Sequence, residues 1–283
     1  MTRDPPVAVD DRRAGWHANL RLTFERRGGA TVGLATHEGP LRVLKSLHPE
    51  GAAVCHQVLV HPPGGIVGGD ALRIEIEVAE GAHAVLTTPG ATRFYRTAGA
   101  EASQAVAATL HAGSRIEWLP LETIVHSGAR AANRAVFRLG DGASMIGWDI
   151  TCLGLPAGGE RFAAGALRQH LEIDGRWLEK GRIDASDERL LRSPLGLAGQ
   201  PVVGTPWVAW SGAGPDEQLL EEARTVLTPP MLAAASRIQP GVIVVRALAD
   251  RVEPINSTFR AVRKAWRRAL WGLGGCEPRV WGV

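Results

Sequence analysis

The amino-acid sequence predicts a mainly β protein with a β-helix-like or stacked-hairpin architecture and about two α-helices near its C-terminal end. Strand-like runs follow one another from about residue 16 to residue 180, and no helical pattern interrupts them. Within this region, glycine turns recur about every 30 residues. Helical spacing is found only after residue 215. These three observations together favour stacked β-structure followed by late helices.

The chain is expected to form a single domain. Of its 283 residues, 45% are apolar and 22% are charged, which is typical of a globular protein with an ordinary core. Residues 1–14 mix proline, aspartate and arginine with few apolar side chains, which predicts a flexible N-terminal tail. The domain is therefore expected to cover residues 15–283.

The clearest strand lies at residues 72–78. Leu72, Ile74, Ile76 and Val78 alternate there with charged side chains, so one face of the strand is apolar and the other is polar. This period of two predicts a strand with one buried face.

A weak internal repeat places a glycine between two strand-like runs in each copy. The four glycines, spaced by 29 to 33 residues, are Gly81, Gly113, Gly142 and Gly175. We interpret each copy as a hairpin whose turn needs the positive φ that glycine allows. Stacked copies predict either an open β-solenoid or a layered sandwich, while chance recurrence of hairpins in an all-β protein remains the alternative.

Two helices are predicted in the last quarter of the chain. The first begins at Asp216, has acidic residues near its start, and is expected to end before Pro229 and Pro230. A strand at residues 242–248 follows. The second helix is expected to be capped by Asn256 or Ser257. Its apolar side carries Phe259, Val262, Trp266, Ala269 and Leu270, and its basic side carries Arg260, Arg263, Lys264, Arg267 and Arg268.

The basic side of this second helix allows more than one interpretation. A basic amphipathic helix can dock on a partner, a membrane or a nucleic acid, or simply cover a sheet, which we expect here. The chain holds 32 Lys and Arg against 29 Asp and Glu, a net charge of +3 with a pI of about 9.0. Because this excess is small and not clustered elsewhere, no nucleic-acid partner is expected.

Cysteine usage and hydropathy indicate the compartment. Cys55, Cys152 and Cys276 lie far apart and form no C-x-x-C pair, so neither a disulfide framework nor a zinc knuckle is predicted. The N-terminus lacks an apolar signal segment, and no stretch reaches the roughly 18 apolar residues of a membrane span. We therefore expect a cytoplasmic protein without a membrane partner.

The most unusual segment is the glycine-rich run HPPGGIVGGD at residues 61–70. It lacks the Gly-Lys-Ser/Thr ending of a phosphate-binding loop and leads into a strand instead of a helix. We interpret it as a structural loop that allows close approach of the backbone. The residues of this loop motif are Pro63, Gly64, Gly65, Gly68, Gly69 and Asp70.

Several motifs, taken in order along residues 15–283, resemble those of the UreD (UreH) family of urease accessory proteins. They are HPPGGIVGGD, LTTPGATRFYR (86–96), WLPLETI (118–124), GWDITCLG (147–154), GERF (159–162), SPLG (193–196) and PRVW (278–281). Two departures are small. Leu121 stands where the family often has Gln, and residues 125–129 (VHSGA) replace a Phe-Asp-Gly-Ala-like tip. The gain of His126 leaves the local metal chemistry open.

The resemblance implies a non-catalytic accessory chaperone with a β-helix-like fold and two helices. It implies docking on apo-urease and on the accessory protein UreF, which brings the GTPase UreG for GTP-dependent nickel insertion. It also implies that nickel passes transiently through a channel inside this chain to the urease active site, with no tightly bound cofactor.

The residues of such a channel can be proposed from their chemistry. Ni²⁺ accepts imidazole, thiolate and carboxylate ligands, but a conduit must bind weakly, which favours scattered carboxylates and hydroxyls. We expect Glu122, Asp149 and Glu160 to contact the metal, with Thr87 and Thr88 lining the path. Structural salt bridges to arginine remain the alternative for these carboxylates. Other possible ligands, more weakly indicated, are Cys55, His56 and His61; Cys55 and Cys152 are more typical of buried apolar positions.

An enzymatic alternative is a carboxylate-dependent β-helical hydrolase. Glu122 and Asp149 could form an acid/base pair, and Cys152 with a histidine could form a nucleophile pair. Neither has the sequence context of a catalytic loop. Partner docking is expected to use some of Trp207, Trp210, Trp266 and Trp281, for which core packing is an equal alternative.

Overall fold

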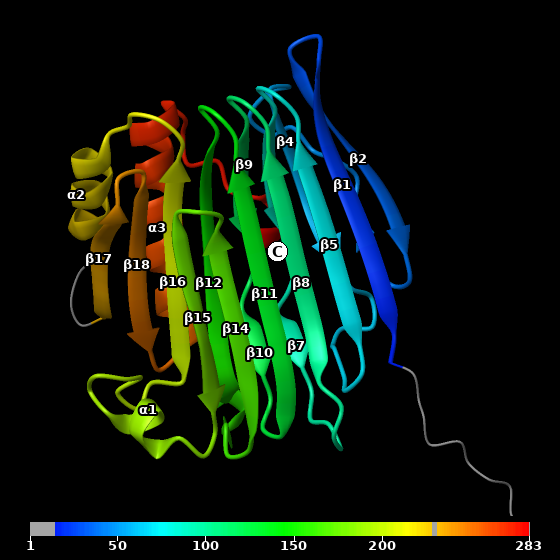
Figure 1. Cartoon of the computed structure of the whole chain (residues 1–283), viewed down its shortest axis with the longest axis vertical. Coiled ribbons are helices and arrows are strands. Elements are labelled where there is room, and N and C mark those ends of the chain that lie inside the picture. The colour runs from blue at the N-terminus through cyan, green and yellow to red at the C-terminus, as the bar shows by residue number, and fades with distance from the viewer. Residues whose placement is uncertain (1–14, 228–230, 283) are drawn as a thin grey trace, which may run out of the picture.

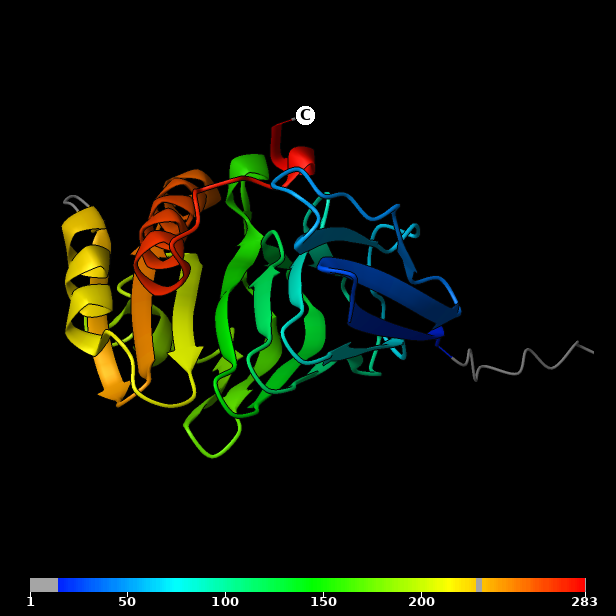
Figure 2. The same cartoon turned by 90° about the horizontal axis from the view of Figure 1, so that it is seen from above.

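The computed structural model describes residues 15–227 and 231–282, which form two facing β-sheets with the two longer helices on the outside of one sheet (Figures 1 and 2). The predicted flexible tail at residues 1–14 lies outside the described residues. The same holds for Pro229 and Pro230, which were expected to end the first helix.

The first sheet has seven strands. Its order is β15 (Trp177–Asp184), β14 (Gly165–Ile173), β11 (Ala129–Leu139), β8 (Ala102–Leu110), β5 (Ala71–Val78), β1 (His17–Arg27) and β2 (Ala30–Glu38). The β5 strand has the predicted alternation, with Leu72, Ile74, Ile76 and Val78 buried.

The second sheet lies behind the first in Figure 1. Its main path is β17 (Leu232–Gln239), β18 (Val242–Ala249), β16 (Val202–Trp210), β12 (Ser144–Leu155), β9 (Arg115–Leu119), β6 (His83–Thr87), β4 (Val54–Val60) and β3 (Arg42–Val43). Short strands β7 (Thr92–Phe94), β10 (Thr123–Val125) and β13 (Glu160–Arg161) extend it, since β10 pairs with β7 and β12, and β13 pairs with β12.

The chain alternates between the two sheets and so forms the coils of a β-solenoid. The strands β4, β6, β9 and β12 are parallel neighbours in the second sheet, and β5, β8, β11 and β14 are parallel neighbours in the first. The predicted mainly β, β-helix-like fold is therefore confirmed. The turns of successive coils also stack, because the Gly81 amide donates to the Ala112 carbonyl at 3.1 Å.

The repeat unit is a coil in three of the four predicted copies. The turns at Gly81, Gly113 and Gly142 join a strand of the first sheet to a strand of the second, whereas Gly175 closes the β14–β15 hairpin. All four glycines have φ between 61° and 67°. Because a solenoid corner and a hairpin both need a positive φ here, the glycine alone could not distinguish them.

Within residues 15–227 and 231–282, three α-helices and two 3₁₀ turns accompany the sheets. The helices are α1 (Glu188–Arg192), α2 (Asp216–Val226) and α3 (Val252–Trp271), and the 3₁₀ turns are η1 (Pro156–Gly158) and η2 (Arg279–Gly282). The sequence predicted α2, α3 and the intervening β18 strand but not the short α1. The predicted cap of α3 is wrong: the helix begins four residues before Asn256, because Pro254 is tolerated in a first turn, where amides lack intrahelical partners.

Helix α3 covers the outer face of the second sheet, as expected, but its basic side is not wholly exposed. Arg263 and Arg267 are 2% and 0% exposed. The Nε atom of Arg263 lies 2.6 Å from the carboxylate of Glu117 on β9, and Nη2 of Arg267 lies 2.6 Å from Glu50. The first of these ion pairs joins the helix to the sheet, and the second joins it to the turn before β4.

The tryptophans considered for docking mostly belong to the core. Trp207, Trp210 and Trp266 are at most 3% exposed. These three side chains therefore pack in the core, which was the alternative to docking. Trp281, next to the C-terminus, is half-buried against Trp148, with ring centroids 5.5 Å apart. In the described part of the chain, no helix is both long and apolar enough to cross a membrane.

Candidate functional site

A row of polar side chains crosses the apolar space between the two sheets. Asn133 on β11 is in register with Gln104 on β8 and with Gln169 on β14. On each strand, the residues two positions before and two positions after the amide residue are apolar and buried between the sheets. Because inward positions alternate along a strand, the three amide side chains lie at one level of the first sheet.

The second sheet completes this row from the opposite side. Asp149 and Thr151 on β12 face inward, and Thr205 on β16 is the register partner of Asp149. All three are at most 8% exposed. We call the following six residues the polar row: Gln104, Asn133, Asp149, Thr151, Gln169 and Thr205.

Asp149 is the carboxylate of the polar row. It accepts hydrogen bonds from Asn133 Nδ2 at 3.0 Å, Thr151 Oγ1 at 3.1 Å and Gln169 Nε2 at 2.5 Å. Burial raises its pKa to about 6 in spite of these donors. Among residues 15–227 and 231–282, no Lys or Arg forms a salt bridge with it, so the arginine-pair alternative does not apply to Asp149.

The polar row joins two hollows of the surface. A cavity of about 210 Å³ at one end includes Gln104 among its lining residues. A second hollow of about 540 Å³ at the other end includes Thr205, together with Glu179 and Arg246. We call these the first and second hollows. Polar side chains therefore lead from one hollow to the other through an otherwise apolar interior.

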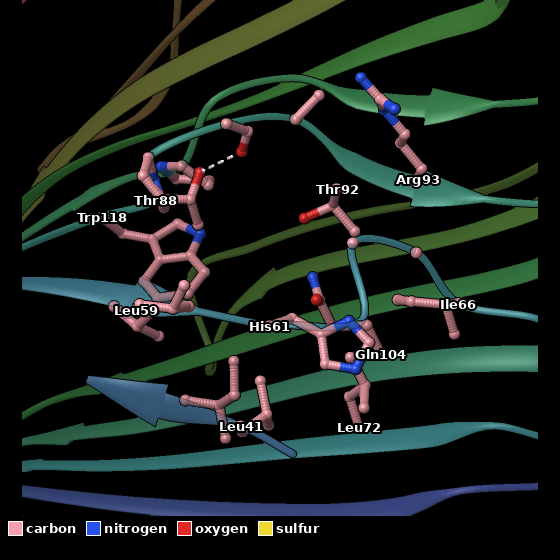
Figure 3. A pocket seen from close by; sticks show the side chains of 18 residues that line it. Leu41, Leu59, His61, Ile66, Leu72, Thr88, Thr92, Arg93, Gln104 and Trp118 are labelled. Carbon is pink, nitrogen blue, oxygen red and sulfur yellow. Dashed lines mark hydrogen bonds between the residues drawn. The ribbon is translucent and has the colours of Figure 1, made fainter. Parts of the chain in front are cut away.

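The first hollow lies between the glycine-rich loop and the segment that carries Thr88 and Thr92. Figure 3 shows His61, Gln104 and Trp118 turned toward this cavity, whose remaining walls are mostly aliphatic. Burial lowers the pKa of His61, which favours the neutral imidazole that can accept a cation. The Thr88 hydroxyl is held by the Leu121 amide at 3.0 Å and the Gly90 carbonyl at 2.9 Å.

The glycine-rich loop frames the first hollow by close packing. The Asp70 carboxylate accepts from the backbone amides of Trp16 at 2.7 Å and Val67 at 2.9 Å. A Cβ at Gly65 would lie 2.0 Å from the Tyr95 ring, and one at Gly68 would lie 1.9 Å from Thr97 Oγ1. Gly64 and Gly69 have positive φ, and Pro63 is exposed at the bend. The loop thus has a structural basis for its glycines.

Three predicted path residues lie away from the polar row. Thr87 faces the outside of the second sheet, where its hydroxyl accepts from Trp281 Nε1 at 2.9 Å. Glu160 is held near the surface by His126 Nδ1 at 2.9 Å and the Ser127 amide at 2.7 Å. Glu122 is half-exposed, and its charge helps to raise the pKa of the Cys152 thiol. Cys152 lies on the face of β12 opposite to Asp149. The structure therefore does not bring these three residues together with Asp149, and a path shared by all four stays a prediction.

The weaker candidates also do not form a metal centre. Burial raises the pKa of Cys55 and of Cys152, in the latter case to about 11, so both thiols hold their protons. His56 is paired with Glu50 at 2.8 Å. Within the ranges that the structure describes, no three His, Cys, Asp or Glu side chains gather closely enough to hold a metal ion.

The acid/base pair of the hydrolase alternative is not assembled. Asp149 points into the space between the sheets, whereas Glu122 lies near the thiol of Cys152, which is on the outer face of the second sheet. The thiol of Cys152 donates weakly to the Gly154 carbonyl at 3.6 Å. Neither arrangement matches a hydrogen-bonded nucleophile and base.

Five residues of the polar row were missed in the sequence. They are Gln104, Asn133, Thr151, Gln169 and Thr205. Asn133 between Ala131 and Ala135, and Gln169 between Leu167 and Leu171, each interrupt an otherwise apolar inward face. Such a single polar residue in an alternating strand was the available signal, but it could be used only with the register between coils.

Comparisons of the sequence with known proteins give one consistent family. Residues 17–282 match the model of the family described as UreD urease accessory protein. The chain is similar to proteins named urease accessory protein UreD from Leptothrix cholodnii and Paracidovorax citrulli, each 49% identical over 274 residues. These matches cover 94% and 95% of this chain, respectively, and 99% of each relative. A relative of the same name from Methylibium petroleiphilum is 50% identical, with 89% of this chain and 91% of that protein covered.

Proposed function

The chain belongs to the UreD urease accessory protein family, and from this premise we propose that it is a non-catalytic scaffold through which nickel reaches apo-urease. Family membership supports a role in urease maturation. The proposal adds that the chain docks on apo-urease and on UreF, and that UreG supplies nickel in a GTP-dependent step. Nickel is then a transient cargo of this chain and not a resident cofactor.

The polar row is the observation that carries the metal-transfer part of this proposal. Isolated polar groups in a protein interior cost free energy unless they are paired, so a continuous row of them needs a reason. The row supplies amide and hydroxyl oxygens and the carboxylate of Asp149, all of which can replace water around a divalent cation. Imidazole is available at the first hollow from His61.

The donor set of the row suits passage better than storage. A tight nickel site would gather several imidazoles, thiolates or carboxylates around one point. Here Asp149 stands among neutral side chains. We therefore place the path through the first hollow with Thr88, along the polar row past Asp149, and out at the second hollow. Glu122, Glu160 and Thr87 are not assigned to this path.

The hydrolase and nucleic-acid alternatives receive no support from the geometry. The two carboxylates of the hydrolase hypothesis are not brought together, because Asp149 points between the sheets and Glu122 lies near Cys152 on the outer face of the second sheet. Two of the five basic residues of α3 are buried in ion pairs, which removes much of the charge that nucleic-acid binding requires.

The proposed function is tested by producing urease together with its other accessory proteins, with and without this chain. We expect urease to contain nickel and hydrolyse urea only when the chain is present. Full nickel content and activity without the chain, in a host lacking a second copy, would contradict the proposal.

A further inference from the structure

The two sheets differ in length at one end of the solenoid. The first sheet ends at β15, whereas the second continues through β16 and β18 to β17. Trp177 on β15 packs against Trp207 on β16, with ring centroids 5.6 Å apart, and Glu179 on β15 is paired with Arg246 on β18. β15 therefore lies over β16 and β18, and β17 extends beyond it (Figures 1 and 2).

The inner side of β17 is consequently uncovered. Leu232, Ala234 and Ser236 pair with inward-facing residues of β18 and share their side of the sheet. All three are exposed, Leu232 by 52%, and none is charged. We call these three residues the β17 face. On the opposite side of the same strand, Ala235 is buried and packs with residues of α2.

Further exposed apolar surface adjoins the β17 face. Leu195, in the loop after α1, is fully exposed and lines the second hollow together with Leu232. Exposed apolar surface concentrated at the open end of a solenoid is typical of a protein-binding surface, since end coils need a cover. The same hollow contains Thr205, where the polar row ends.

The edge beside the β17 face is also free to pair. β15 is the terminal strand of the first sheet, so its backbone groups on one side have no strand partner among the described residues. Neighbouring strands lie about 4.8 Å apart. A strand added to β15 would therefore lie above β17 and cover the β17 face.

The side chains around this free edge specify the chemistry of the added strand. Side chains on its inner side would meet Leu232 and Ala234 and must be apolar. Those on its outer side would lie beside Leu178, Lys180 and Arg182, which are exposed on the outer face of β15. Of the two cations, Arg182 is already paired with Asp184. Lys180 has no ion-pair partner among the described residues, so acidic side chains fit opposite it.

We infer that a partner protein docks at this end by adding an extended segment of alternating apolar and acidic residues to the edge of β15, over the β17 face. The inference rests on the proposed function, because the partner that docks here also closes the end of the polar row. It assigns a surface and a binding mode, β-augmentation, to one of the protein partners of the chain.

The experiment measures binding of purified UreF and of purified apo-urease to this chain. Leu232→Asp and Lys180→Glu alter the docking surface, and Leu34→Asp and Lys45→Glu make the same changes at exposed positions remote from it. Both altered residues are exposed, so the fold is expected to tolerate them. We expect at least tenfold weaker binding of one partner to the first two variants and unchanged binding to the two controls.

Hydrogen exchange of the unaltered chain tests the binding mode directly. Amides at residues 177–184 should exchange at least tenfold more slowly in the complex with that partner. Unchanged binding by the variants, or no added protection at 177–184, would overturn the inference and leave the proposed function intact. Failure of the unaltered chain to bind either partner would overturn both.

Discussion

Asp149 is a buried carboxylate that pairs with no Lys or Arg in the described part of the chain, and its three neutral donors only partly replace water. Its inward orientation was expected, because it lies within apolar, strand-like sequence. The absence of an arginine partner was not predictable, since 32 Lys and Arg residues left many possible partners open. Ion pairs between distant segments depend on which coils become neighbours, which no local pattern gives.

The raised pKa of Asp149 predicts a pH-dependent loss of stability. The native state binds its proton more tightly than the unfolded chain, in which the pKa is near 3.8. The contribution of Asp149 to stability should therefore fall as the pH rises from about 4 to about 6 and stay lower above that range. The shift corresponds to about 2 to 3 kcal/mol at neutral pH.

Asp149→Asn tests this prediction because it removes the titrating group and keeps its shape. Urea unfolding at pH 4.5 and pH 7.5 should show a smaller loss of stability with rising pH for the variant than for the unaltered chain. Identical pH profiles would show that Asp149 titrates normally in the folded protein.

At the scale of elements, the glycine-rich loop is held by steric fit at Gly65. Because a Cβ there would lie 2.0 Å from the Tyr95 ring, Gly65→Ala should destabilise the fold by about 1 to 3 kcal/mol. Gly90→Ala is the matched control, since a Cβ at Gly90 meets no atom within 4 Å. Thermal unfolding should separate the two variants, and equal midpoints would mean that the loop adjusts without cost.

Helix α3 illustrates what an amphipathic pattern leaves undetermined. The pattern predicted the helix and its apolar stripe, but not that two of its arginines are buried in ion pairs with Glu117 on β9 and with Glu50 in the turn before β4. Burial and the charges of Arg263, His83 and Arg267 act in opposite directions on Glu117, and its pKa falls to about 2. Glu117 lies 146 residues before Arg263 in the chain and in no local motif, so its partners could not be predicted from the sequence.

Removing one arginine of this cluster should be costly. Arg263→Met leaves Glu117 with less compensation in a fully buried site, and we expect a loss of about 3 to 5 kcal/mol in the free energy of unfolding. Lys264→Met, next to it on the exposed side of the same helix, should change stability by less than about 0.5 kcal/mol. Urea unfolding followed by tryptophan fluorescence measures both; similar losses would contradict the proposed anchoring role of Arg263.

For the whole molecule, the fold class could be predicted from three patterns in the single sequence: alternating strands, a glycine period near 30 residues and late helices. The site could be predicted only in part. Its members lie on strands β8, β11, β12, β14 and β16, and they form a row only because of the register between coils. Sequence analysis could therefore identify Asp149 as a candidate but could not separate it from Glu122 and Glu160.

In the proposed function, the polar row would let a metal ion pass without a tight cluster of ligands, none of which is found among the described residues. Its two ends open at separate hollows, and the second lies beside the exposed β17 face. Docking of partners at the ends would shield a cation from bulk water during passage. The whole solenoid, and not a single cluster of ligands, is then the functional unit.

The most direct test of this account is the nickel content of urease matured with an Asp149→Leu variant of the chain. Glu122→Leu is the matched control, because it removes a carboxylate that lies near the thiol of Cys152, on the outer face of the second sheet. With binding of UreF and apo-urease verified for both, we expect at least a tenfold loss of nickel for Asp149→Leu and near-normal nickel for Glu122→Leu. Full nickel content with Asp149→Leu would contradict passage through the polar row.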